Sequence, residues 1–128
     1  MVPVRILVVD AANVVGSVPD GWWRDRPGAA ARLHGRLVRA ALPFDSVGFV
    51  VEGAARRGVS VGVEGGVTTV HAPGVGDDEI VSRCQELVDG GATVALASAD
   101  RGLLARVEPL GVLAMGPRSL RDLLEAAG

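Results

Sequence analysis

Short runs of consecutive apolar residues alternate along the chain with longer segments of mixed polarity. The apolar runs, each bounded by turn-forming residues, cover residues 4–9, 47–51, 67–70, 94–97 and 112–115, and a smaller piece lies at 59–63. Short, valine-rich runs that are continuous rather than alternating are typical of parallel strands buried on both faces. The pattern therefore predicts a mostly parallel sheet of about five strands.

Segments with helical spacing separate these runs. Residues 27–42 bring leucines to one side of a helix and arginines largely to the other, and Pro27 suits the first turn. Similar spacing predicts helices over residues 77–88, 101–110 and 119–127. Because strands that alternate with helices form βαβ units, we expect a three-layer α/β sandwich with helices on both faces of the sheet. No internal repeat or linker is evident, so we expect residues 1–128 to form a single domain.

Two connections between the predicted elements are long. Residues 53–66 are rich in Gly and Arg and are expected to be the most mobile loop. Residues 16–28 form the second long connection and contain the adjacent Trp22 and Trp23.

The composition narrows the class of protein. A chain of 128 residues suits one compact core, and no apolar run approaches the roughly 18 residues of a membrane helix. The N-terminal sequence lacks the charged head, apolar stretch and small-residue cleavage site of a signal peptide. Cys84 is the only cysteine, which excludes an internal disulfide and a zinc site built on paired thiols. We therefore expect a cytoplasmic protein with no membrane partner.

Charge is distributed unevenly along the chain. The formal net charge is −2, which argues against a general coat for nucleic acid. Residues 22–57 contain seven Arg and three acids, whereas residues 64–108 contain eight acids and three Arg. Such asymmetry between segments can reflect charged partners. All 13 basic residues are Arg, whose guanidinium group binds phosphate through two parallel hydrogen bonds.

Acidic side chains follow several of the predicted strands. Asp10, Glu52 and Asp100 each follow a strand, and an Asp-Asp pair begins a predicted helix. Ligands of such sheets bind outside the carboxyl ends of the strands, and gathered like charges are costly to bury unless a cation compensates them. Carboxylates are ligands for Mg²⁺ or Mn²⁺. The sequence therefore predicts a metal site formed by Asp10, Asp77, Asp78 and Asp100. Glu52 is a candidate additional acid, and Asn13 is expected to hold the Asp10 loop or to orient a phosphate or a water.

Each acid also has an ordinary structural explanation. Asp10 is a candidate cap for the turn after its strand, and Asp100 for the N-terminus of the next helix. An Asp-Asp pair at a helix N-terminus stabilises the helix dipole by about 0.3–1 kcal/mol. For Glu52, a surface pair with one of the arginines that follow it is favoured over a metal ligand. Independent caps need not all fall at one edge of a sheet, so the joint pattern favours a shared acidic site.

The residues around these acids resemble a known family. The pieces VVDAANVVGS, FVVEG, GDDEIV and ASADRGL, in this order and spacing, resemble the NYN domains of the PIN-like nuclease superfamily, especially the YacP-like branch. The similarity runs from Val4 to about Met115. It implies a Rossmann-like, PIN-like sandwich and metal-dependent cleavage of RNA.

The resemblance also implies roles for individual residues. Matched position by position, it assigns catalytic roles to Asp10, Asn13, Asp77 and Asp100. Asp78 is the second member of its pair and is either a metal ligand or a helix cap. Glu52 departs from the family, in which relatives often carry Asp after the same strand. Because PIN-like proteins often act as dimers, the resemblance also admits a homodimer.

An RNA substrate, expected to be single-stranded, must be held as well as cut. Candidates for phosphate contacts are Arg24, Arg26, Arg56, Arg57 and Arg101. Arg101 is alternatively a partner for a neighbouring acid. Trp22 and Trp23 are candidates for stacking on bases, worth about 1–3 kcal/mol per base, although at least one of them is favoured as a core or half-exposed residue. His34 and His71 are expected to be structural or surface residues.

Two rival functions remain open. One is hydrolysis of a nucleotide or another small phosphoester at the same acidic site. The other is a catalytically inactive module that binds RNA or protein. A P-loop nucleotidase is excluded because the chain has no Gly-Lys-Ser/Thr motif, and a dinucleotide-binding protein because DAANVVGS lacks the three-glycine turn.

Overall fold

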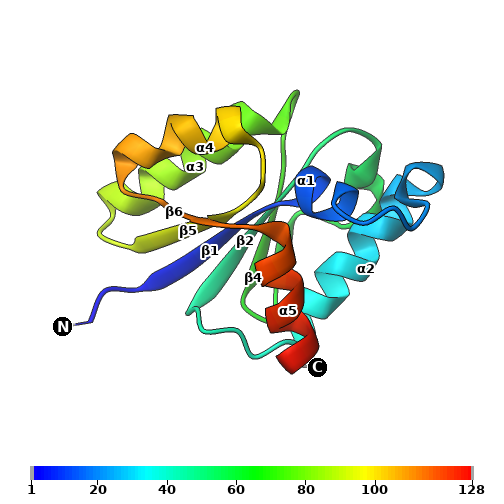
Figure 1. Ribbon diagram of the computed structural model, residues 1–128, viewed down its shortest axis with the longest axis horizontal. Helices are drawn as coiled ribbons and strands as arrows, with labels where there is room; N and C mark the ends of the chain where they lie inside the picture. The colour runs from blue at the N-terminus through cyan, green and yellow to red at the C-terminus, as the bar shows by residue number, and fades with distance from the viewer. Residues whose placement is uncertain (1, 128) are drawn as a thin grey trace.

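A central sheet with helices on both faces forms the computed structural model, which describes residues 2–127 (Figure 1). Within these residues the sheet has six strands in the order β3-β4-β2-β1-β5-β6. The strands are β1 (Arg5–Asp10), β2 (Ser46–Val51), β3 (Gly62–Glu64), β4 (Val67–His71), β5 (Thr93–Ala97) and β6 (Leu113–Met115). Five strands run parallel, and β3 pairs antiparallel with β4 at one edge. The mostly parallel α/β sandwich predicted from the sequence is therefore confirmed.

Helices cover both faces of the sheet. One face packs against α1 (Ala11–Gly16), α2 (Arg26–Arg39) and α5 (Pro117–Ala127), and the other against α3 (Gly76–Asp89) and α4 (Arg101–Val107). Three short 3₁₀ helices complete the connections, namely η1 (Trp22–Arg24), η2 (Gly53–Gly58) and η3 (Glu108–Leu110). None of the helices in residues 2–127 combines the length and the apolarity that crossing a membrane requires.

The core lies on both sides of β1, the strand between β2 and β5. Leu7 and Val9 pack in the cluster that includes Leu120 of α5, whereas Val8 packs in the cluster that includes Ile80 of α3. All three β1 side chains are fully buried. Successive side chains of a strand point to opposite faces of a sheet, so a strand covered on both faces requires the continuous apolar run seen in the sequence.

Helix ends differ from the sequence expectations at prolines. α2 ends at Arg39 rather than at residue 42, and Ala40 is already extended. Pro43 disfavours helical backbone at the residue before it, which limits the helix. α4 ends at Val107 rather than at residue 110, because the chain continues into the 3₁₀ turn η3, which contains Pro109.

The two long connections contain more regular structure than the sequence predicted. Residues 53–66 include η2 and the edge strand β3, and residues 16–28 include η1 and the first turn of α2. Asp25 caps that turn by accepting a hydrogen bond from the Gly28 amide at 2.9 Å. The sequence pattern also missed α1, because AANVVG carries two β-branched residues and no apolar helical stripe.

Candidate functional site

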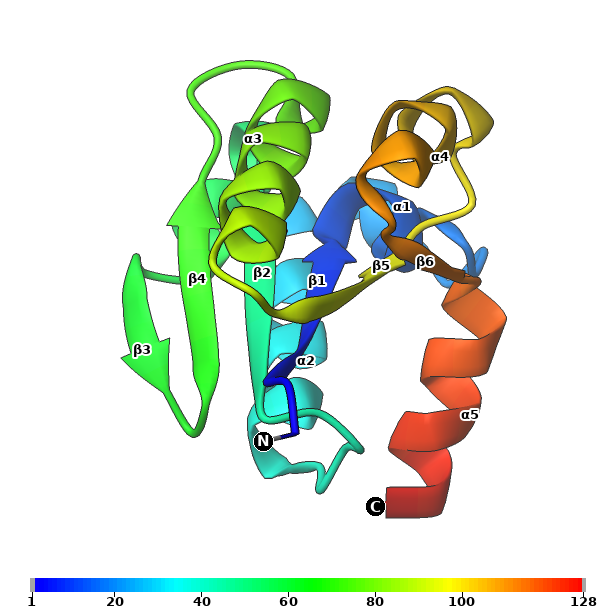
Figure 2. The same ribbon diagram turned by 90° about the vertical axis from the view of Figure 1, so that its left-hand side faces the viewer.

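Polar side chains from three neighbouring strands meet at the edge of the sheet that is formed by the carboxyl ends of its parallel strands. Asp10 is the last residue of β1, and Glu52 and Ser98 directly follow β2 and β5, the strands on either side of it. Figure 2 shows β1, β2 and β4 pointing toward the end of the molecule where α1 begins. The strand order thus brings together residues that lie far apart in the sequence.

Asp10 is the most buried acid of this edge, with 5% of its surface exposed. Its Oδ2 accepts a hydrogen bond from Ser98 Oγ at 2.9 Å, and its Oδ1 accepts a longer one from the Asn13 amide at 3.4 Å. Burial raises the pKa of the Asp10 carboxyl above its ordinary value of 3.8, the two hydrogen bonds lower this pKa in part, and the charges of Asp77 and Glu52 raise it further. The two hydrogen bonds therefore do not fully offset the cost of burying the ionised carboxylate of Asp10.

Asn13 and Ser98 tie the loop after β1 to the loop after β5. Asn13 Oδ1 accepts a hydrogen bond from the Ala99 amide at 2.8 Å. Ser98, which is 1% exposed, accepts a hydrogen bond from the Asp100 amide at 3.1 Å while its hydroxyl donates to Asp10. Ser98 lies in the ASADRGL motif, but the sequence pattern by itself assigns it no role. The signal that identifies it is a small polar residue at the end of a buried strand.

Asp100 and Asp77 supply the other two carboxylates of the edge. Asp100 caps α4, because its Oδ1 accepts a hydrogen bond from the Leu103 amide at 3.1 Å, which confirms the expected N-cap. Its other oxygen has no hydrogen-bond partner within the part of the chain that the structure describes. Burial and then the charge of Asp100 raise the pKa of the Asp77 carboxyl, whereas Arg106 lowers it. Asp77 and Asp100 therefore lie close enough to repel each other.

Asp78 lies in a different environment from Asp77. Its side chain is 87% exposed, and its Oδ1 accepts a hydrogen bond from Arg106 at 2.9 Å. This ion pair joins the first turn of α3 to α4. Arg106 was not identified from the sequence, where nothing distinguishes it from other arginines on the exposed face of a helix.

Within residues 2–127, the carboxylates of this edge do not form a site with three direct protein ligands for a metal ion. Among residues 2–127, no three His, Cys, Asp or Glu side chains converge closely enough to hold a metal ion directly. Neighbouring acids nevertheless raise the pKa of Asp10 and the pKa of Asp77, so each of these two carboxylates has a second acid near it. Mg²⁺ retains several waters and is often bound by only one or two carboxylates, so these oxygen donors fit a hydrated ion that is held in part through water.

Within residues 2–127, Glu52 does not form the surface ion pair with a following arginine that the sequence favoured. Arg56 donates its hydrogen bonds to the carbonyl oxygens of Gly53 at 3.1 Å and Ala72 at 3.4 Å, and Glu52 forms no ion pair within residues 2–127. The expected surface pair is therefore wrong, because the turn of η2 directs the guanidinium of Arg56 to backbone oxygens. Glu52 Oε1 lies against Gly76 instead, at 2.9 Å from where a Cβ of that residue would stand.

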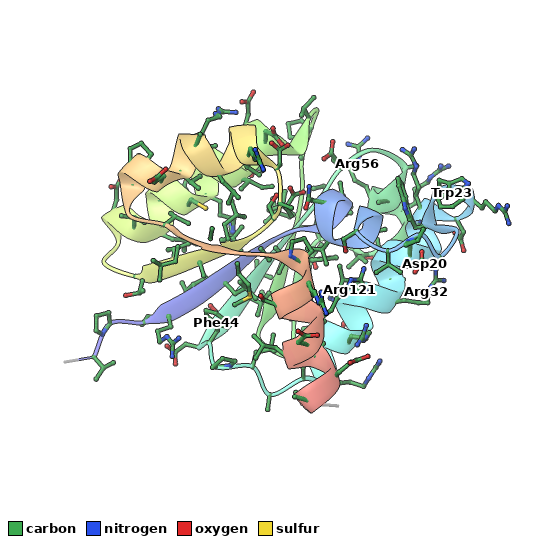
Figure 3. All side chains as sticks on the ribbon, viewed as in Figure 1. Asp20, Trp23, Arg32, Phe44, Arg56 and Arg121 are labelled. Carbon is green, nitrogen blue, oxygen red and sulfur yellow. The ribbon has the colours of Figure 1, made fainter. Side chains whose placement is uncertain are left out.

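The two tryptophans lie together on η1. Their rings meet edge to face with centroids 5.9 Å apart, and neither belongs to the buried core. Arg26 lies over the ring of Trp22 at 5.4 Å and Arg24 over the ring of Trp23 at 5.8 Å. Trp22 is half-buried, whereas Trp23 is 51% exposed and projects outward beyond α2 (Figure 3).

The remaining predicted basic residues are exposed. Arg57 and Arg101 form no ion pair or side-chain hydrogen bond within the described part of the chain, so the alternative partner expected for Arg101 is not present. Arg56 and Arg57 line a shallow depression together with His71. His71 Nε2 is hydrogen-bonded to the Val59 carbonyl at 2.7 Å, and His34 lies 3.8 Å from Glu64, as expected of structural histidines.

Solved structures of Rae1 (YacP) from Bacillus subtilis have a similar fold. A crystal structure of a Rae1 mutant matches with a TM-score of 0.74 and 21% sequence identity, covering 96% of this chain and 76% of that chain. A second crystal structure of Rae1 matches with a TM-score of 0.69 and 18% identity, covering 95% and 74%. No family model and no curated protein sequence matches this chain. The likeness confirms the YacP-like resemblance at the level of the fold.

Proposed function

We propose that this protein is a metal-dependent ribonuclease that hydrolyses phosphodiester bonds at an acidic site formed by Asp10, Asp77 and Asp100. The observation that carries the proposal is the burial of Asp10 beside other acids, with no arginine paired to it in residues 2–127. Burying such a charge is costly for the fold unless a cation compensates it. The fold likeness to Rae1 (YacP) and the resemblance to NYN nucleases support phosphodiester chemistry.

In this proposal the three carboxylates hold Mg²⁺ or Mn²⁺, in part through water. When bound, the ion lowers the pKa of a water and neutralises charge on the leaving oxygen. Asp10 is held in place by the Ser98 hydroxyl and the Asn13 amide. Asp100 contributes its second oxygen, because its first caps α4. Asp78 is not included, since Arg106 already neutralises it.

Asn13 acts as a positioning residue in this scheme. Its side-chain oxygen is committed to the Ala99 amide, so it fixes the loop after β1 against the loop after β5. Its side-chain NH₂ group makes no hydrogen bond within residues 2–127 and is available to a phosphate oxygen or a water.

RNA is the proposed substrate class because cationic and aromatic side chains flank the acidic site. Arg24 and Arg26 of η1 and α2 are exposed beside the tryptophans, and Arg57 of η2 is exposed on the neighbouring connection. Guanidinium groups bind phosphate, and aromatic rings stack on unpaired bases, which favours a single-stranded polymer over a small phosphoester.

The test is cleavage of single-stranded RNA in the presence of Mn²⁺, with nucleoside triphosphates assayed in parallel. Asp10→Asn and Asp100→Asn are each expected to abolish RNA cleavage, and Asn at position 100 retains the helix cap. Asp122→Asn, an exposed residue of α5, is the matched control and is expected to cleave at the wild-type rate. Hydrolysis of triphosphates without cleavage of RNA would assign the site to small phosphoesters. Unchanged cleavage by both site variants would refute the proposal.

One observation favours a second candidate, an inactive module that binds RNA. Within residues 2–127, no three acids of this edge lie close enough together to bind a metal ion directly. A metal that binds the native state raises its stability by mass action. If the proposed nuclease is right, Mn²⁺ raises the Tm of the wild-type protein but not that of Asp10→Asn. RNA binding without this shift and without cleavage would support the inactive module.

A further inference from the structure

A cavity of about 230 Å³ lies beside the acidic site. Its walls are small apolar side chains of α1, α2 and η2 together with Trp22, Arg26 and Glu52. Ala11 and Ala12, which belong to its wall, directly follow Asp10 in the chain. A group bound in this cavity is therefore adjacent to the proposed reaction centre.

The cavity has the dimensions and the surfaces of a site for one flat ring system. Pockets for drug-sized ligands have volumes of roughly 300–1,000 Å³, so this smaller cavity does not suit a whole nucleotide. The Arg26 guanidinium lies over one face of the Trp22 ring at 5.4 Å, so the two form a stacked pair of planar groups, and nucleobases stack on groups of both kinds. The remaining lining residues, which are mostly alanines, carry no polar side chain.

Glu52 is the one acidic residue among those that line the cavity. No hydrogen bond or ion pair occupies its carboxylate in residues 2–127. Glu52 Oε1 lies so close to Gly76 that a Cβ at position 76 would displace it. The glycine therefore leaves room for the glutamate side chain, which is longer than the Asp that relatives often carry. A half-buried carboxylate without a partner is a strong acceptor for paired N–H donors.

We propose that this cavity binds one nucleobase of the RNA and that Glu52 selects guanine. The inference rests on the proposed ribonuclease function for its substrate class. Guanine is the one standard base whose Watson–Crick edge carries two adjacent N–H donors, which match the two oxygens of a carboxylate. Adenine and cytosine place an acceptor beside their amino group, and uracil flanks its single N–H with carbonyl oxygens. Glu52 is thereby a specificity residue of the cavity and not a metal ligand.

The first experiment measures binding of nucleoside monophosphates without any requirement for catalysis. Trp23→Phe leaves Trp22 as the only tryptophan, so quenching of its fluorescence reports on the cavity. Guanosine monophosphate is expected to bind about tenfold more tightly than the adenosine, cytidine and uridine monophosphates, since a bidentate contact discriminates between bases. Glu52→Gln in the same background is expected to remove this preference, and Glu86→Gln, an exposed residue near the end of α3, is expected to retain it. Equal affinity for all four monophosphates would overturn the proposal.

The second experiment measures cleavage of RNA oligonucleotides of equal length with and without guanine. The wild-type protein is expected to show a KM about tenfold lower for the guanine-containing RNA, and Glu52→Gln to lose this difference with little change in kcat. Ala12→Leu, which fills the cavity from an exposed position, is expected to raise KM for that RNA, whereas Ala105→Leu on α4 is the matched control. A fall in kcat for every RNA on Glu52→Gln would assign Glu52 to the acidic site and refute base selection.

The outcomes separate this inference from the ribonuclease proposal. Cleavage of RNA with no dependence on guanine or on Glu52 would remove the base site and leave the nuclease. Selective binding of guanosine monophosphate through Glu52, with no cleavage of any RNA, would remove the nuclease and leave the base site.

Discussion

Replacing Asp10 by Asn is expected to stabilise the metal-free protein while abolishing its response to metal. The carboxylate is almost fully buried, and its pKa is raised above 3.8, mainly by that burial. A raised folded-state pKa means that the fold favours the protonated form. The stability contributed by this group is fully present below pH 3.8 and is lost as the pH rises through the folded-state pKa. At neutral pH the ionised Asp10 therefore destabilises the fold, and Asn, which is neutral, does not.

The magnitude follows from the contacts of the side chain. Burying an ion costs several kcal/mol, and this cost is removed by the substitution. Two hydrogen bonds to the carboxylate lose their charge assistance, which is worth about 1 kcal/mol each and less for the long one from the Asn13 amide at 3.4 Å. The Ser98 hydroxyl, now 2.9 Å from Asp10, can turn to accept from the new amide. The net expectation is a gain of about 1–2 kcal/mol, which corresponds to a rise in Tm of about 3–8 °C.

The assay is thermal and urea unfolding at neutral pH in the presence of a chelator, with Asp122→Asn as the exposed control. The gain in Tm of Asp10→Asn over the wild type is expected to shrink as the pH falls toward 4, because the wild-type carboxyl then becomes protonated. Addition of Mn²⁺ is expected to raise the Tm of the wild type and of the control only. A loss of stability in Asp10→Asn at neutral pH, or a gain independent of pH, would show that its ionised form is well compensated in the fold.

Three further predictions test the surroundings of the site. Ser98→Ala removes a hydroxyl that links two loops and is expected to lower the free energy of unfolding by about 1–3 kcal/mol in urea; an unchanged midpoint would show that the link is not needed. Arg106→Ala breaks an exposed ion pair and is expected to change stability by less than about 1 kcal/mol. Because Arg106 lowers the pKa of Asp77, the pH profile of cleavage is expected to move to higher pH in this variant, and an identical profile would contradict the link. Gly58→Ala would drive a Cβ into the Pro27 carbonyl and is expected to destabilise the fold by about 1–3 kcal/mol in thermal unfolding. Gly74→Ala, whose Cβ would meet open space among the described residues, is expected to have little effect. Equal effects of the two substitutions would refute the close packing at Gly58.

Local patterning determined the architecture of this protein. The continuous apolar runs predicted the parallel strands because a strand buried on both faces needs an apolar residue at every position. Because the carboxyl ends of parallel strands meet at one edge of the sheet, the sequence also predicted that Asp10, Glu52 and Asp100 lie there. The sequence pattern did not predict α1, where two valines and a glycine conceal a short helix.

The connections between these elements were decided only by the tertiary structure. The Ser98 hydroxyl reaches Asp10 across 88 positions of sequence, and Arg106 reaches Asp78 across 28. Sequence periodicity is a local property, whereas these contacts depend on which strands are neighbours and how α3 and α4 pack on them. For the same reason only the fold revealed that the Glu52 carboxylate has no partner within residues 2–127 and that a cavity lies beside it, because the turn of η2 directs Arg56 away.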